Sequence, residues 1–487
     1  MTIIPTGSQP RRFGAIAGVS EYSGAEMSFS RRSFLLGAGS GLSLLVLTAC
    51  TEPAPTPTPS VSSTPTFSVP RPKLMQRSNW TSDPYARGSH SFVTVGSTPQ
   101  FRDDLRQPII GRIFFAGEAT SSDLPGSVLG AQNSGERAAA EISGVAQKGE
   151  RIAIIGAGAA GAEAARQLAN SGHNVIVIEA RNRVGGRIDT RQSKSWPLPV
   201  ELGAWRLDKT ADAVLLGKLA ELGIQTNPFT GALLKGAKAT ATENTVGPKA
   251  VASALTWAGT QIKDVSLAGA LDGSGAAKGA PDSGGLAGKD LLAQYLASLA
   301  TVNGASDSKL SGWYGLAGLP QYDHLVDGGF VGLIADALQG VTTSLSTAVV
   351  GISYSDSGVS LQLGTGESLK VDRALVTVPL GVLQEGSIRF NPLLPFSHRT
   401  AIASLGMGAV ETVWLRYDTP FWSTDAAVWN LVGTGDDLGT WFNLRAITGQ
   451  NILVGLAGGD AARRLSKLSD DELLVSALHA LEPFAGG

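Results

Sequence analysis

The chain has a single cysteine, Cys50, among 487 residues. One thiol allows neither a disulfide within the molecule nor a cysteine-rich metal site. The sequence therefore predicts no metal centre. At 43% hydrophobic residues, a chain of this length can instead bury a large apolar core.

Charge is also scarce, because charged residues make up 16% of the chain and the formal net charge is -2. Proteins that bind nucleic acid neutralise phosphates with an excess of lysine and arginine. No such excess exists here, so we expect no nucleic-acid partner.

A long apolar run is missing, although a short one occurs near the N-terminus. Ser30-Arg-Arg-Ser-Phe-Leu35 precedes the run 35–49, which ends in Leu47-Thr-Ala-Cys50. This pattern resembles a twin-arginine export signal joined to a lipoprotein processing site. It predicts a leader over 1–50, export by the twin-arginine route and a lipid anchor at Cys50 on the outer face of the cell membrane. The alternative is a retained membrane helix, but a bilayer needs ~20 apolar residues. Translation could start at Met1 or Met27.

Residues 51–72 are rich in proline, serine and threonine. Such a segment cannot bury a core and favours an extended, partly polyproline chain. We interpret it as a linker, with ordered sequence beginning near Lys73.

A glycine loop lies between two apolar strands. Arg151-Ile-Ala-Ile-Ile155 leads into Gly156-Ala-Gly-Ala-Ala-Gly161, an alanine-rich helix should follow to Ala169, and Asn174–Glu179 is a second buried strand. This βαβ spacing is typical of dinucleotide binding. The glycines permit a tight turn, close approach of the backbone to pyrophosphate and helix packing, while Glu179 can accept the ribose hydroxyls and would repel a 2′-phosphate. A glycine-rich turn without nucleotide is the alternative.

Further motifs identify a family. Glu179-Ala-Arg-Asn-Arg-Val-Gly-Gly-Arg187, Glu201-Leu-Gly-Ala-Trp205 and Arg112-Ile-Phe-Phe-Ala-Gly-Glu-Ala-Thr120 resemble flavin contacts of the flavin-dependent amine oxidase family. The resemblance implies noncovalent FAD, with Arg187 against the pyrophosphate, Glu118 by the ribityl chain, and Ser127 and Val128 near the ring. The implied cofactor-binding residues are Gly117, Glu118, Ser127, Val128, Gly156, Gly158, Ala159, Ala160, Gly161, Glu179, Ala180, Arg181, Gly185, Gly186, Arg187, Gly203, Ala204 and Val349.

The order of the motifs differs from that of the family. The segment from Arg112 to Ala139 precedes the glycine loop, whereas the family places it far behind. Each motif occurs once, so we interpret the chain as a circular permutant. The junction 143–150 contains two glycines and predicts a flexible bridge. A helix should begin at Gly126-Ser-Val128 and run through Ala138, with its N-terminus beside the flavin.

The expected fold class is α/β, with a Rossmann-like FAD-binding domain and an α+β substrate domain that has a mixed sheet. After the leader and linker, the FAD-binding domain should comprise 73–207 and a return over 346–395. The substrate domain should comprise 208–345 and 396–487. Within it, we expect the segment 268–288, rich in glycine and alanine, to form a long surface loop.

Three departures from the family pattern involve five residues. Glu411 and Thr412 replace an Asn-Lys pair whose lysine reaches flavin N5 through water. Ser89 stands where some members attach flavin through cysteine, and His90 and Ser127 replace paired tyrosines. Thr412 can bind a water but brings no cation.

Three residues are catalytic candidates by resemblance: Thr412, His90 and Trp80, which would wall the flavin. His90 could accept a proton or contact a polar substrate, because its ordinary pKa is ~6.5. It could equally be a satisfied histidine in the wall, and Thr412 an ordinary strand residue. His324 is expected to be structural.

The resemblance predicts an enzyme that transfers hydride from an amine or amino acid to FAD, with O2 as acceptor and H2O2 as product. The expected partners are therefore a small-molecule substrate, an electron acceptor and, through Cys50, the membrane. Two alternatives remain open: a dehydrogenase or desaturase of a non-amine substrate, because the lysine is absent, and a flavin-binding surface protein without turnover.

Overall fold

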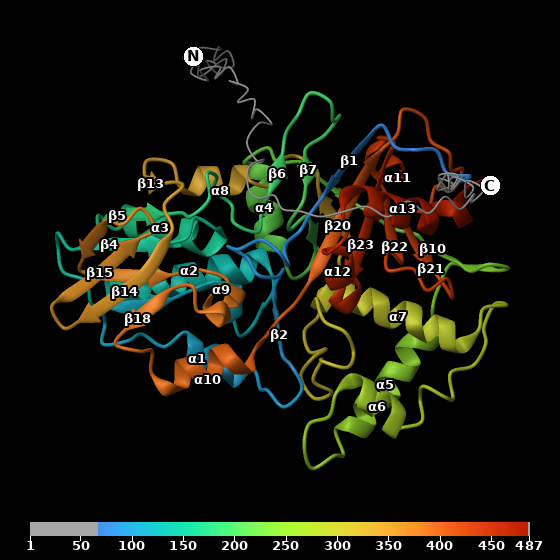
Figure 1. Ribbon diagram of the computed structural model, residues 1–487, viewed down its shortest axis with the longest axis horizontal. Coiled ribbons are helices and arrows are strands. Elements are labelled where there is room, and N and C mark those ends of the chain that lie inside the picture. Colours follow the sequence, from blue (N-terminus) through green and yellow to red (C-terminus); the bar gives the residue numbers. More distant parts are fainter. Residues whose placement is uncertain (1–66, 486–487) are drawn as a thin grey trace, which may run out of the picture. The chain divides into compact units, whose positions relative to one another are not determined.

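The computed structural model describes residues 67–485, which lie within one compact unit (Figure 1). The predicted leader and lipid-anchor site therefore lie outside the described residues. Order begins before Lys73, because Val69 is already buried. Among the described helices, none has the length and apolar content needed to cross a membrane.

A five-stranded parallel sheet forms the nucleotide-binding half of this unit. Buried β-branched residues on its strands explain why both faces can be covered. Its strands, in spatial order, are β13 (Thr342–Ser344), β5 (Asn174–Ile178), β4 (Arg151–Ile155), β17 (Arg373–Val376) and β3 (Ile113–Phe115).

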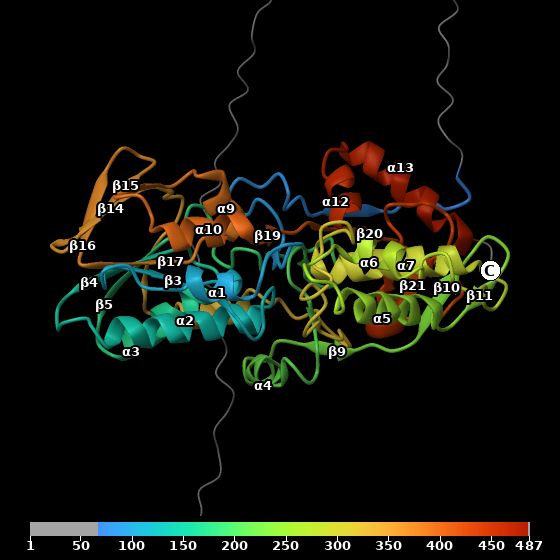
Figure 2. The same ribbon diagram turned by 90° about the horizontal axis from the view of Figure 1, so that it is seen from below.

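Alternate residues of β4 bury the two faces of this sheet. Ile152 and Ile154 pack with the helices α2 (Val128–Ser143) and α3 (Ala159–Asn170). Ala153 and Ile155 pack on the opposite face. That face is covered by a second sheet, as Figure 2 shows, formed in spatial order by β16 (Ser368–Val371), β15 (Gly358–Leu363), β14 (Val349–Ser355) and β18 (Arg389–Asn391).

The displaced segment is part of this half. Strand β3 pairs in parallel with β17, with Ile113 opposite Ala374. Helix α2 lies against α3 so closely that a Cβ on Gly135 would stand 2.2 Å from the carbonyl oxygen of Ala160. Residues before and after the junction therefore build one layer.

A seven-stranded sheet forms the other half. In spatial order its strands are β1 (Leu74–Arg77), β20 (Val410–Arg416), β23 (Ile452–Gly458), β22 (Thr440–Asn443), β21 (Val428–Leu431), β10 (Ala232–Lys235) and β11 (Thr240–Ala241). All pairs are antiparallel except β10 with β21, so the sheet is mixed, as expected.

Two domain boundaries were wrong. Strand β1, assigned to the FAD-binding domain, pairs with β20, with Leu74 opposite Arg416. Strand β13, assigned to the substrate domain, pairs with β5, with Thr342 opposite Ile176. Short strands carry too little pattern to reveal which sheet they join.

The helices below the mixed sheet are α5 (Val246–Ala258), α6 (Leu267–Gly273) and α7 (Gly288–Asn303). The prediction of a long loop over 268–288 was wrong for its first part, which is α6. Ser266 caps this helix by accepting from the Gly269 amide, and Leu267 and Leu271 are buried. Small residues there serve packing, because Gly273 lies directly against the Trp257 ring.

The remaining elements are short strands and helices. They are β2 (Ser91–Phe92), β6 (Thr190–Arg191), β7 (Val200–Glu201), β8 (Arg206–Leu207), β9 (Thr226–Pro228), β12 (His324–Val326), β19 (Gly406–Met407), α1 (Gln100–Leu105), α4 (Ala213–Glu221), α8 (Gly332–Ala337), α9 (Leu380–Glu385), α10 (Phe396–Ser404), α11 (Leu444–Thr448), α12 (Gly459–Leu465), α13 (Asp470–Leu481), and the 3-10 turns η1 (Glu118–Thr120) and η2 (Glu482–Phe484).

The last described α-helix begins with a side-chain cap. Ser469 and Glu472 form a reciprocal capping box at the start of α13. Near both ends of the described chain, Phe67, Val69, Phe484 and Ala485 belong to a single hydrophobic cluster.

The junction differs from the flexible bridge that we expected. Ser143 is the last residue of α2, and the carboxylate of Glu150 accepts a 2.6 Å hydrogen bond from Arg373 Nε. An ion pair therefore fixes the end of the bridge to β17.

Candidate active site

A cavity of about 460 Å³ lies beside the glycine loop and extends to both sheets. It is lined by residues from before and after the junction. All three catalytic candidates, Trp80, His90 and Thr412, line it, as do all predicted cofactor-binding residues except Gly161.

The glycines of the loop have different functions. Gly156 has φ +113°, a conformation that side-chain-bearing residues rarely adopt. A Cβ on Gly161 would lie 2.0 Å from the Gly156 carbonyl oxygen, so Gly161 serves helix packing and not the cavity wall. Helix α3 begins after Gly158 without a side-chain cap, so its first N–H groups can bind an anion at the cavity.

Glu179 lies at the end of β5 and holds two turns of backbone. Its carboxylate accepts from Ala157 N at 2.9 Å and from Arg181 N at 2.8 Å. Arg181 in turn pairs with Asp83 at 2.6 Å. The carboxylate thus stands at the cavity wall where the sequence places the ribose.

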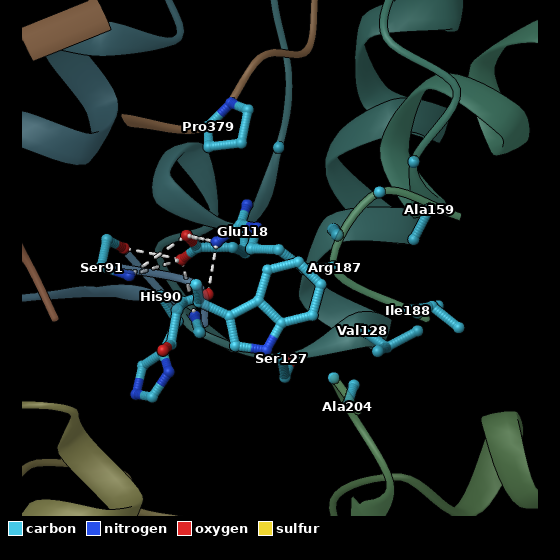
Figure 3. A pocket seen from close by; sticks show the side chains of 18 of the residues that line it. His90, Ser91, Glu118, Ser127, Val128, Ala159, Arg187, Ile188, Ala204 and Pro379 are labelled. Atoms are coloured by element: carbon cyan, nitrogen blue, oxygen red, sulfur yellow. Dashed lines mark hydrogen bonds and ion pairs between the residues drawn. The ribbon is translucent and has the colours of Figure 1, made fainter. Parts of the chain in front are cut away.

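Glu118 is the centre of a buried charge cluster. Its carboxylate accepts from Arg187 Nη1 at 2.8 Å, from Ser91 Oγ at 2.6 Å and from Gly126 N at 3.0 Å (Figure 3). Burial alone would raise the pKa of Glu118, but the charges of Arg187 and Arg102 lower it to about 2. Glu118 is therefore ionised at all physiological pH values.

Arg187, which was expected against the pyrophosphate, lines the cavity. Its Nη1 donates to Glu118 and to the Ser89 carbonyl oxygen, at 2.8 Å each. The sequence prediction could not include this link, since its two ends belong to motifs on opposite sides of the junction.

The helix predicted from Gly126 is confirmed as α2. Ser127 is its N-cap and accepts from Gly130 N at 2.9 Å. The remaining N–H groups of the first turn have no acceptor within the helix. Since Ser127 and Val128 line the cavity, the start of α2 lies at its wall.

His90 faces the same cavity from the turn before β2, and Figure 3 shows its imidazole turned away from the Glu118 cluster. Burial lowers its pKa below 6.5, with Arg187 and Arg206 acting in the same direction. The ring is therefore neutral near pH 7. Its Nε2 lies 2.9 Å from the Val302 carbonyl oxygen, which requires a proton on that nitrogen and leaves Nδ1 as an acceptor.

Thr412 presents a hydroxyl that has no hydrogen-bond partner among the described residues, although its side chain is buried. Buried polar atoms are nearly always paired. Thr412 is therefore a candidate contact for a polar group in the cavity, which this residue lines. His324, by contrast, does not line the cavity and bonds Asp323 at 2.8 Å.

Sequence reasoning missed Arg206. Its guanidinium lines the cavity, lies 4.5 Å from the centre of the Tyr322 ring and donates to the Thr301 carbonyl oxygen at 2.8 Å. Burial lowers its pKa, and no ion pair of residues 67–485 includes it. The signal was present, because Arg206 directly follows the Glu201-Leu-Gly-Ala-Trp205 motif. Tyr322 had no comparable signal.

A glycine loop, a strand-end carboxylate and two helix N-termini around one cavity define a dinucleotide-binding oxidoreductase. The family model for flavin containing amine oxidoreductase matches residues 60–143, 159–268 and 283–486, and one for pyridine nucleotide-disulphide oxidoreductase matches 115–195. The chain belongs to the flavin containing amine oxidoreductase family, and FAD is its cofactor.

Named relatives are similar over much of the chain. Polyamine oxidase 4 of Oryza sativa subsp. japonica is 29% identical over 69% of this chain and 73% of its own. Polyamine oxidase 2 of Arabidopsis thaliana is 27% identical over 66% and 69%. Putrescine oxidase bound to putrescine has a similar fold, with a TM-score of 0.55 at 19% identity over 69% of this chain and 82% of that one. Cyclohexylamine oxidase from Brevibacterium oxydans IH-35A gives 0.55 at 20% identity over the same shares.

The cavity fits this cofactor. The uncapped start of α3 suits the pyrophosphate, Glu179 suits the ribose, and the start of α2 suits the electron-rich end of the ring. These positions remain predictions from the motifs and the cavity.

Proposed function

We propose that this enzyme oxidises amines that also carry a carboxylate, such as amino acids. The observation that carries this proposal is Arg206, a cation without a carboxylate partner in the wall of the cavity. A cationic amine alone would be repelled by it, whereas a substrate carboxylate would form a charge-assisted pair. Bound FAD would accept hydride from the carbon next to the amine.

The residues around Arg206 would orient such a substrate. Thr301 and Val302, adjacent near the C-terminal end of α7, hold Arg206 and His90 through their carbonyl oxygens. The guanidinium would bind the carboxylate, and neutral His90 offers Nδ1 as an acceptor for a polar hydrogen of the substrate. The apolar walls exclude water from the reacting carbon.

Anaerobic reduction of the flavin tests this proposal. The panel should contain pairs of amino acids and the amines that lack only the carboxyl group. We expect bleaching of the flavin by amino acids and little by the matched amines. Bleaching by the amines alone would reject the role of Arg206, and bleaching by neither would reject amine oxidation.

We propose O2 as the acceptor, giving H2O2. A dehydrogenase with another acceptor is the second candidate, since Thr412 brings no cation to the cavity. Mixing the reduced enzyme with air and then with a quinone separates the two. Fast reoxidation by the quinone and slow reoxidation by air would favour the dehydrogenase. A flavin that no substrate bleaches would favour a binding protein without turnover.

We also propose that the chain is a circular permutant. One structural feature supports it: Phe67 and Phe484, near the two ends of the described chain, share one hydrophobic cluster. A variant with 67–143 moved behind Gly487 by a short linker should fold and bind FAD. Failure to bind FAD with any linker length would argue against this proposal.

Export and lipid anchoring are proposed from the sequence around Arg31-Arg32 and Cys50. A folded-protein export route suits a flavoprotein, because FAD must be bound before the membrane is crossed. Cys50→Ser should release the protein from the membrane fraction. Unchanged membrane association would overturn the lipid anchor.

A further inference from the structure

The loop 78–83, which we call the Trp80 loop, separates two cavities. Trp80 lines the main cavity and also a second one of about 340 Å³, which Ser82, Asp83 and Arg191 line as well. Trp80 is 6% exposed, so packing holds the indole in part. Directional contacts on the side of the second cavity help to set its position.

Four hydrogen bonds of the Trp80 loop end on one side chain, the carboxylate of Glu411. It accepts from Ser78 Oγ at 2.5 Å and from Trp80 N at 3.1 Å through one oxygen. The other oxygen accepts from the backbone N and the hydroxyl of Thr81, both at 3.0 Å. The loop thus directs four donors at a carboxylate that is 4% exposed.

The strand register explains why this position can hold the loop. Pairing of β1 with β20 ends where Arg77 lies opposite Val413, so the chain leaves the sheet beside Glu411. Ser78 Oγ continues the connection, because it also accepts from Thr412 N at 2.8 Å. Glu411 and Thr412 point to opposite faces of β20, which leaves Thr412 to the cavity and Glu411 to the loop.

We propose that Glu411 is a positioning residue that fixes Trp80 as a wall of the flavin site. It acts through the backbone of residues 78–81 and not by contact with substrate. A second bond, from Trp80 Nε1 to the Leu202 carbonyl oxygen at 2.9 Å, then sets the indole plane. The inference depends on the flavin site and is independent of the substrate class.

Hydrogen exchange of the protein without FAD gives the first test. In Glu411→Gln an NH2 group replaces one of the two carboxylate oxygens, so the backbone N–H of either Trp80 or Thr81 loses its acceptor. We expect one of these two amides to exchange about tenfold faster or more, the cost of one unpaired buried donor. Glu163→Gln is the matched control, a buried carboxylate on α3 that pairs with Arg166 and should leave both amides unchanged.

Flavin fluorescence of the loaded protein gives the second test, because an indole in contact with flavin quenches its emission. Trp80→Phe should raise the emission, and Glu411→Gln should raise it in part. In the Trp80→Phe background, Glu411→Gln should have no further effect, as expected of two residues that act as one unit. Equal and additive effects would overturn the proposal.

Two milder variants, at Thr81, test the proposal if Glu411→Gln does not fold. Thr81→Ala removes one of the four hydrogen bonds, and Thr81→Ser restores it. We expect a smaller rise in emission for alanine and the wild-type signal for serine. Wild-type exchange and emission in both Glu411→Gln and Thr81→Ala would overturn the role of Glu411.

Discussion

Arg187 donates a 2.8 Å hydrogen bond to Glu118 and thereby joins two motifs on opposite sides of the junction. Ser91 and the nearly unexposed Arg102 complete the cluster. A lone buried carboxylate would be costly, whereas this one is ionised because two cations surround it. The pair is a structural link between the displaced segment and the βαβ unit.

Glu118→Gln should therefore lower the free energy of unfolding by roughly 3 kcal/mol, because it leaves two guanidinium groups without their counter-charge. FAD affinity should fall as well. Denaturant unfolding and FAD titration measure both effects. Glu136→Gln, on the exposed face of α2, is the control and should change neither. Wild-type stability in Glu118→Gln would show that the cluster is not a stabilising link.

The same cluster predicts how the free energy of unfolding falls at low pH. The pKa of Glu118 is lowered to about 2, so its stabilisation is complete above the ordinary value of 4.5 and is lost as pH falls toward 2. Between pH 4.5 and 2, Glu118→Gln should lose less stability than the wild type. Parallel pH curves for the two proteins would contradict the assignment.

The contribution of Glu201 to stability has the opposite pH dependence. Burial raises its pKa to about 7, although Phe330 N and Thr190 donate to it. Its contribution is present below pH 4.5 and is lost as pH rises through 7, by up to roughly 3 kcal/mol. Glu201→Gln should remove this fall in unfolding free energy between pH 4.5 and 8. Glu243→Gln, at an exposed position, should retain it.

Helix packing across the junction gives a paired glycine test. Gly135→Ala would place a Cβ 2.2 Å from the Ala160 carbonyl oxygen and should cost at least about 1–3 kcal/mol. Gly217→Ala, in α4 with open space around it, should stabilise by roughly 0.5–1 kcal/mol. Thermal unfolding measures both, and equal effects would refute the close approach of α2 to α3.

Arg206→Met keeps length and removes the charge. If Arg206 binds the substrate carboxylate, KM for amino acids should rise about 10- to 100-fold, the worth of a charged hydrogen bond. KM for the matched amines should not change. A uniform fall in kcat for every substrate would indicate a structural role for the residue instead.

Thr412→Val removes a hydroxyl that lacks a partner among residues 67–485. The unfolding free energy should stay within about 1 kcal/mol of the wild type or rise. Thr440→Val in the same sheet breaks a 3.1 Å bond to Asn430 and should destabilise. If a water at Thr412 serves the reaction, flavin reduction should slow roughly tenfold, as for one lost hydrogen bond. An unchanged rate would make Thr412 an ordinary strand residue.

The glycine loop, β5 and α2 could be predicted from sequence, because local period and capping residues determine them. Sheet membership of β1 and β13 could not, since pairing of three- or four-residue strands is decided by distant partners. Helix α6 could not be predicted for a related reason. Its small residues are typical of a loop, and only the fold shows that Trp257 packs against them.

The site divides in the same way. Residues inside motifs, such as Glu179 and Ser127, were predicted to bind the cofactor and line the cavity. Arg206 and Tyr322 were missed because their importance depends on which carbonyl and which ring lie beside them. The link between Glu118 and Arg187 also requires the fold, because 69 positions separate the residues.

The parallel pairing of β3 with β17 has a consequence for partial proteins. A fragment that begins at Arg151 would keep the whole glycine fingerprint and the pairing of β17 with β4, yet leave the other side of β17 unpaired. Unpaired strand borders recruit other chains. Such a fragment should precipitate when expressed, although it contains sequence motifs expected of an intact flavoprotein.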